Sequence, residues 1–83
     1  MKEILKYPLS TEKSVKLMES ENKITFIVSN KAKKDEIKKA IEENFRVKVL
    51  KVSTLIQKGR KKAYIKLSPD NPAIDIATQF GLM

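Results

Sequence analysis

The chain has 83 residues, enough for one compact domain with a small core, so we expect a single domain over residues 1–83. Its 18 Lys and Arg against 10 Asp and Glu give a formal net charge of +8, which favours a polyanionic partner bound at the surface. Cys and His are both absent, which excludes disulfides, Cys/His metal sites, thiol nucleophiles and imidazole bases.

The first residues predict a short strand and then a helix. The apolar stretch 3–9 is interrupted by a proline, which is typical of an edge strand. Hydroxyl caps at Ser10 and Thr11 begin a helix that runs to about residue 18 or 20. Glu12 lies in its first turn, where the helix dipole favours an acid.

The next segment predicts a second strand and a second helix. Residues 23–29 alternate and are rich in β-branched and aromatic side chains, with Ile24, Phe26 and Val28 on one face. The period then changes, and residues 33–45 carry the apolar stripe of an amphipathic helix, made of Ile37, Ala40, Ile41 and Phe45. The opposite face of this helix carries Lys34, Lys38, Lys39 and Glu42. With Lys31 and Lys33, these lysines exceed what solubility requires, so we predict that some of them face phosphate.

Residues 47–67 predict a β-hairpin. The apolar alternation of 47–57 slips by one residue, which predicts a bulge near Leu50 and Lys51. The segment KGRK (58–61) is then a short basic tip. In the following strand, one face is shared by Ala63, Ile65 and Leu67 and the other by Lys62, Tyr64 and Lys66.

The C-terminal segment predicts a third helix over about Pro72–Phe80, with Asn71 as its cap and Gly81 at its end. Its apolar side is predicted from the spacing of Ile74, Ala77 and Phe80, with Ala73 and Ile76 beside them. The order β-α-β-α-β-β-α with short connections predicts an α+β domain, a four-stranded, mostly antiparallel sheet covered by helices.

The remaining acids and glycines do not form an enzyme site. Glu42 and Glu43 are adjacent, so on a helix they point about 100° apart, and two Gly cannot build a phosphate-binding loop. We therefore predict no enzymatic activity, no cofactor and no small-molecule substrate. No stretch has the apolar length of a signal peptide or of a membrane span of about 18 residues, so we expect a cytoplasmic protein without membrane insertion.

Most of the cations are Lys, which favours point-charge contacts to phosphates over reading of base edges. One alternative is an RNA-recognition-motif-like binder of single-stranded RNA, whose consensus strand displays stacking aromatics. Lys62 and Leu67 stand at two of those aromatic positions, and Tyr64 alone is not a stacking platform. A basic module for acidic proteins is the rival outside nucleic acids.

The main hypothesis is a structural RNA binder that grips folded RNA by its backbone. The predicted RNA-binding residues are the cations of the two basic segments and the one displayed ring: Lys31, Lys33, Lys34, Lys38, Lys58, Arg60, Lys61, Lys62, Tyr64 and Lys66. The alternative explanation of the basic strand is an edge strand whose lysines prevent aggregation and need no ligand.

Three segments, in order, resemble a known family: PLSTEKS (8–14), AKKDEIKKAIEENFRVKVLKVSTLI (32–56) and GRKKAYIKL (59–67). Together they closely resemble the L23 (uL23) family of large-subunit ribosomal proteins, over nearly the whole chain. The short hairpin tip is similar to that of archaeal members, because bacterial members carry a long loop there.

The resemblance implies a cytoplasmic ribosomal protein bound to large-subunit rRNA, mainly its third domain, beside the mouth of the peptide exit tunnel. It also implies ribosomal protein L29 as a neighbour and the signal recognition particle as a docking factor. In bacterial relatives the glutamate matching Glu12 touches the chaperone trigger factor, which implies factor docking here; the local alternative is a helix-stabilising acid.

The chain departs from that family at two positions. Relatives often have Gly or Asn where Arg46 stands, and Arg makes a left-handed helix cap costlier. Relatives often have Asn where Ser53 stands, and Ser offers a shorter hydrogen-bonding group.

Overall fold

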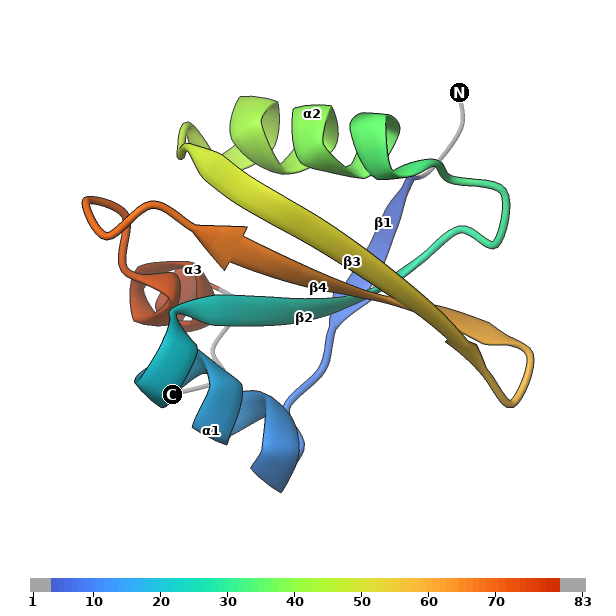
Figure 1. Cartoon of the computed structure of the whole chain (residues 1–83), viewed down its shortest axis with the longest axis horizontal. Coiled ribbons are helices and arrows are strands. Elements are labelled where there is room, and N and C mark those ends of the chain that lie inside the picture. Colours follow the sequence, from blue (N-terminus) through green and yellow to red (C-terminus); the bar gives the residue numbers. More distant parts are fainter. Residues whose placement is uncertain (1–3, 80–83) are drawn as a thin grey trace.

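The computed structural model describes residues 4–79. The elements in chain order are β1 (Leu5–Pro8), α1 (Glu12–Glu21), β2 (Lys23–Val28), α2 (Lys34–Phe45), β3 (Val49–Gln57), β4 (Arg60–Leu67) and α3 (Ala73–Gln79). The strands form one antiparallel sheet in the order β1-β2-β4-β3 (Figure 1). This confirms the predicted α+β order. Phe80 and Gly81, predicted at the end of the third helix, lie outside the described residues.

The core lies on one face of the twisted sheet. From the sheet it takes Ile24, Phe26 and Val28 of β2 and Ala63, Ile65 and Leu67 of β4, as the alternation predicts. From the helices it takes Met18 of α1, Ile37 and Ile41 of α2, and Ala73, Ile76 and Ala77 of α3. Figure 1 shows α2 along one side of the sheet, and α1 and α3 together at the end where β2 begins. We call the face of the sheet opposite this core the outer face.

α1 begins at a reciprocal cap. Thr11 Oγ1 accepts a hydrogen bond from the Ser14 backbone N at 3.2 Å, and Ser14 Oγ accepts one from the Thr11 N at 2.7 Å. These two bonds satisfy amides that no helical carbonyl can reach. The predicted hydroxyl cap is therefore Thr11, and Glu12 is the first helical residue.

α2 packs its predicted stripe inward, and the Phe45 ring lies 6.1 Å from the ring of Phe26. Glu42 was predicted on the charged outer face, and that prediction is wrong. Its carboxylate is half-buried and accepts a hydrogen bond from the Val49 N at 3.1 Å, so it ties α2 to the start of β3. After Phe45 the chain leaves the helix through Arg46 in the left-handed conformation, with φ of 54°.

The predicted bulge is confirmed. Val49 pairs with Leu67 and Lys51 with Lys66, so Leu50 is the extra residue, and its side chain is exposed.

The predicted basic tip is shorter than expected. Gln57 pairs with Arg60, which leaves Lys58 and Gly59 as the turn, with φ of 53° and 74°. Positive φ at both central residues is the geometry that matches the twist of two antiparallel strands.

Two predictions for α3 are wrong. Asn71 does not cap it, because its Oδ1 accepts a hydrogen bond from the Lys48 N at 2.9 Å. The first amide of α3, that of Ala73, instead donates to Asn22 Oδ1 at 2.7 Å. Ile74 is 43% exposed, since the buried side consists of Ala73, Ile76 and Ala77. The spacing of apolar residues alone did not distinguish a buried side that includes Ile74 from one made of Ala73, Ile76 and Ala77.

Candidate nucleic-acid interface

The outer face of β4 presents cations to solvent. Lys62, Tyr64 and Lys66 alternate with the buried core residues of the strand, as predicted, and Arg60 has the same phase. Lys66 is exposed, while Lys62 and Tyr64 are half-buried. Lys62 Nζ donates to Gln57 Oε1 at 2.9 Å on β3, which leaves two of its three N–H donors for other partners.

Lysines from three strands lie in one row across this face. Lys66 pairs in register with Lys23 of β2 on one side and with Lys51 of β3 on the other. Like charges directly opposite one another destabilise a sheet, so this row opposes folding. The repulsion is reduced at the Lys23 end of the row, because Lys23 Nζ lies 3.1 Å from Glu21 Oε1. The arrangement is understandable if a polyanion neutralises it.

A ring and a guanidinium complete the surface at the hairpin end. Arg60 Nη1 donates to the Tyr7 hydroxyl oxygen at 3.2 Å, which joins β4 to β1 across the outer face. Gln57, Lys58, Arg60 and Lys62 line a shallow depression of about 460 Å³ there. We call Lys23, Lys51, Arg60, Lys62, Tyr64 and Lys66 the sheet-face cluster.

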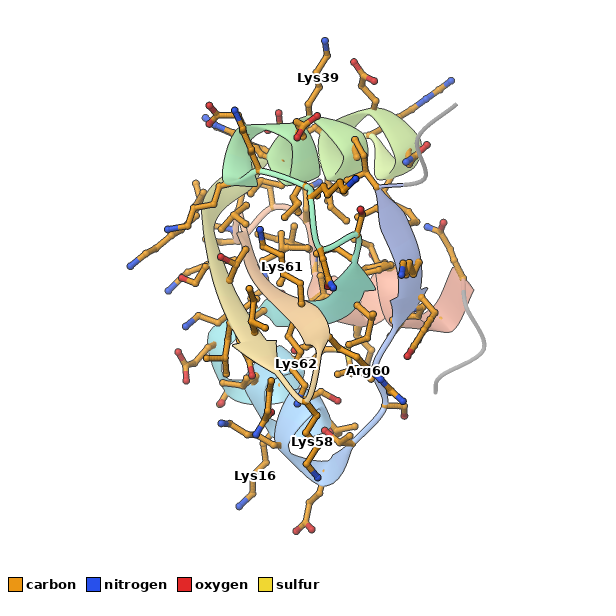
Figure 2. The ribbon with its side chains drawn as sticks, turned by 90° about the vertical axis from the view of Figure 1, so that its right-hand side faces the viewer. Lys16, Lys39, Lys58, Arg60, Lys61 and Lys62 are labelled. Carbon is orange, nitrogen blue, oxygen red and sulfur yellow. The ribbon has the colours of Figure 1, made fainter. Side chains whose placement is uncertain are left out.

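Lys61 lies apart from this cluster. Its side chain has the phase of the core face, and its Nζ donates to the Ala32 carbonyl at 2.6 Å. Figure 2 shows Lys61 beneath the segment that leads into α2, whereas Lys58, Arg60 and Lys62 lie at the hairpin end. Placing Arg60 and Lys61 in the hairpin tip was wrong, because both belong to β4 and point to opposite faces.

The other predicted cations gather at the start of α2. Lys31, Lys33, Lys34 and Lys38 are all exposed, and we call them the α2 cluster. Asn30 Nδ2 donates to the Gly59 carbonyl at 3.1 Å, so the loop before α2 is held against the hairpin tip. Lys39, also on α2, points away from the sheet (Figure 2).

Few of these charges are neutralised within the molecule. In the part of the chain that the structure describes, the Lys23–Glu21 pair is the one ion pair. Within the same residues, no three acids gather closely enough to hold a metal ion. Nor does any helix between residues 4 and 79 have the length and apolar character to cross a membrane.

Strand order excludes one of the two explanations of the basic strand. β4 lies between β2 and β3, so it is an interior strand, and the edge strands are β1 and β3. The edge-protection explanation is therefore wrong for β4, because an interior strand has no open edge to protect. Its exposed lysines need another explanation.

The outer face also lacks a stacking platform. Phe26 is buried in the core and Phe45 packs against it. Among residues 4–79, the rings on the outer side of the sheet are Tyr64, which is half-buried, and Tyr7, which is 42% exposed and bonded to Arg60. This composition suits contacts to a nucleic-acid backbone better than stacking of successive bases.

Glu12 is exposed in the first turn of α1, away from the lysine row. With Thr11, Lys13 and Lys16 it lines a shallow depression of about 420 Å³ on α1. Both explanations of Glu12, helix stabilisation and contact with a partner, suit this position.

Sequence reasoning missed Lys23 and Lys51 as members of the surface. The phase of each within its own strand could have indicated that they face outward. Their place beside Lys66 follows only from strand pairing, and for Lys51 it also depends on the bulge.

Comparison with known proteins identifies relatives. A family model described as "Ribosomal protein L23" matches residues 3–71. The "Large ribosomal subunit protein uL23" of Trypanosoma brucei brucei is 51% identical over 81 residues, which is 96% of this chain and 49% of that protein. The chain thus spans about half the length of this curated relative.

The matched residues run from β1 to the loop between β4 and α3, and they include both clusters. Ribosomal proteins are structural components of the ribosome, which agrees with the predictions of a ribosomal protein and of no enzymatic activity. On the extent of the family match and the identity to the relative, the chain belongs to the ribosomal protein L23 family.

Proposed function

We propose that this chain binds large-subunit rRNA through the sheet-face cluster, with the α2 cluster as a second contact, as a structural constituent of the large ribosomal subunit. The observation that carries the proposal is the lysine row Lys23–Lys66–Lys51 on the outer face of the sheet. The row opposes folding, and Lys66 at its centre lies on an interior strand, which has no open edge to protect. Phosphates would relieve this repulsion and release counterions.

Membership of the L23 family supports a proposed location in the large subunit. We propose contact with the third domain of the rRNA beside the mouth of the exit tunnel, with ribosomal protein L29 as a neighbour. Glu12 and the depression beside it are proposed as part of a docking site for targeting factors such as the signal recognition particle. The two-residue hairpin tip differs from the long loop of bacterial members, but the relative reported above is from a trypanosome, so the tip does not single out the predicted archaeal type. A tip of this length gives no support to a role inside the tunnel.

The test is salt-dependent binding of an rRNA third-domain fragment. Lys62→Ala/Lys66→Ala removes two cations from the outer face of β4, whereas the control Lys16→Ala/Lys39→Ala removes the same charge from two helices. If both lysines contact phosphate, the slope of log K against log salt should fall in magnitude by about two for the first variant, and by less than about one for the control.

Equal slopes for the two double variants would contradict the proposal, since net charge alone would then explain the binding. The wild-type chain should also sediment with the large subunit. A chain that remains with acidic proteins after nuclease treatment would favour the rival module.

A further inference from the structure

Thr25 has a hydroxyl without a partner. The residue lies in β2 with 3% of its surface exposed, and its Oγ1 has no hydrogen-bond partner. It is the one buried side-chain polar atom in this condition among the described residues. Burying a hydroxyl without a partner destabilises the folded chain, and a valine of the same shape would avoid the cost. A buried hydroxyl without a partner in the protein therefore points to a ligand as its partner.

Thr25 lies at a small recess on the outer face of the sheet. The recess measures about 30 Å³ and is lined by Leu9 before α1, by Thr11, Lys13 and Ser14 at the start of α1, by Thr25 of β2, and by Lys62 and Tyr64 of β4. Its volume holds one water-sized group, such as a single phosphate oxygen, with the rest of the phosphate outside. The walls offer two cations and several hydroxyl groups.

The start of α1 adds a favourable field. α1 has 10 residues, and the positive end of its dipole lies at Thr11 and Glu12, beside the recess. The reciprocal bonds between Thr11 and Ser14 hold this end in place. Glu12 is not among the residues that line the recess; it lines the neighbouring depression on α1, which shares Thr11 and Lys13 with the recess.

We propose that this recess is a phosphate subsite for the RNA backbone. One non-bridging phosphate oxygen accepts a hydrogen bond from the Thr25 hydroxyl, and the ammonium groups of Lys13 and Lys62 contact the same phosphate. Lys62 retains two N–H donors after its bond to Gln57. The proposal rests on the proposed function, and it adds Lys13 and Thr25 to the surface and fixes the position of one phosphate.

The decisive variant is Thr25→Val, which removes the hydroxyl and keeps the shape. In the full chain bound to the rRNA fragment, we expect Kd to rise about tenfold, as for loss of one charge-assisted hydrogen bond. The salt slope should stay unchanged, because a neutral hydroxyl releases no counterion. The matched control is Thr54→Val, a strand threonine that pairs with Ala63 and so has the core-face phase. It should leave Kd within about twofold.

The stability of Thr25→Val without RNA distinguishes a recess that is filled by a phosphate oxygen only in the complex from one that holds a water molecule in the free protein. If the hydroxyl is unbonded without RNA, Thr25→Val should raise the urea midpoint, whereas a water in the recess would make it fall. A lower midpoint with unchanged Kd, or an unchanged Kd alone, would overturn the proposal. Thr25→Ser keeps the hydroxyl and should keep wild-type affinity. If Thr25→Val does not fold, Lys13→Gln provides the test, because Lys13 is exposed. The slope of log K against log salt for rRNA binding should fall in magnitude by about one for this variant, and an unchanged slope would overturn the proposal.

A second probe distinguishes failure of the subsite from failure of the proposed function. Inorganic phosphate titrated into the full chain should shift the amide resonances of Lys13, Ser14 and Thr25, and these shifts should be lost in Thr25→Val. Such shifts without rRNA binding would support the subsite and reject the proposed function. Binding of rRNA that depends on Lys66 but not on Thr25 would do the reverse.

Discussion

Single residues in unusual backbone conformations show where this chain carries strain. Asn22, Arg46 and Lys58 all have positive φ, between 53° and 55°. Asn tolerates this region because its side chain can bond locally, whereas a long side chain with a Cβ meets the neighbouring carbonyl. The resemblance-based expectation that Arg46 makes the exit from α2 costlier fits this conformation. The left-handed cap is kept, and Arg46 is exposed.

Arg46→Gly is therefore expected to stabilise the chain by about 0.5–1 kcal/mol, because Gly adopts the left-handed region without steric cost. The greater conformational entropy of Gly in the unfolded state offsets part of this gain. Urea unfolding measures it. Arg46→Ala, which keeps a Cβ, is the control and should give no gain. A gain of the same size for Ala would show that removal of the charge, and not the backbone, is responsible.

At the scale of elements, Asn22 joins three segments that are distant in sequence. Its Nδ2 donates to the carbonyls of Leu67, Ser68 and Asn71 at 3.1–3.3 Å, and its Oδ1 accepts from Ala73. Its backbone carbonyl accepts from the Leu67 N at 3.1 Å. One residue thus ends α1, fixes the end of β4 and caps α3, so the position of α3 over the core depends on it.

Asn22→Ala should lower the free energy of unfolding by about 2–4 kcal/mol, since it leaves partly buried carbonyls and the first amide of α3 without partners and puts Ala at positive φ. Asn30→Ala is the matched control, because Asn30 is exposed and makes one side-chain bond, to Gly59. Its loss should stay below about 1 kcal/mol. Chemical denaturation of both variants makes the comparison, and equal losses would contradict the central role of Asn22.

At the scale of the whole molecule, the sheet separates the core from the proposed RNA surface. The helices bury one face, and the outer face collects cations from β2, β3 and β4. The start of α1 lies at the border of this surface. Of the two depressions there, Thr25 lines the recess, Glu12 lines the other one, and Thr11 and Lys13 line both. An RNA contact and a factor contact can therefore be separated by mutation.

Glu12→Gln is expected to weaken binding of the signal recognition particle to large subunits that carry this chain, several-fold, and not to weaken rRNA binding. It removes one acid beside the proposed phosphate subsite, so RNA affinity should stay equal or rise. Co-sedimentation measures the first effect, and Glu19→Gln, an exposed acid further along α1, is the control. Unchanged factor binding would leave Glu12 with the local role of stabilising α1.

Much of this protein follows from local sequence rules. Alternation in 23–28 and 62–67 predicted both buried faces, the slip in 47–57 predicted the bulge, and hydroxyl and acidic residues predicted the start of α1. These features depend on residues a few positions apart, where backbone geometry fixes the side-chain direction. The same rules predicted the outward phase of Lys62, Tyr64 and Lys66.

The tertiary structure decided what depends on pairing between distant segments. It placed β4 inside the sheet, aligned Lys66 with Lys23 and Lys51, and turned Glu42 and Asn71 toward Val49 and Lys48. It also left the Thr25 hydroxyl buried beside the start of α1. The sequence by itself determined the order of the elements, the buried faces of β2 and β4 and the excess of positive charge. Which cations share a surface was decided by strand order and register, because these are set by the packing of the whole core and by no local pattern.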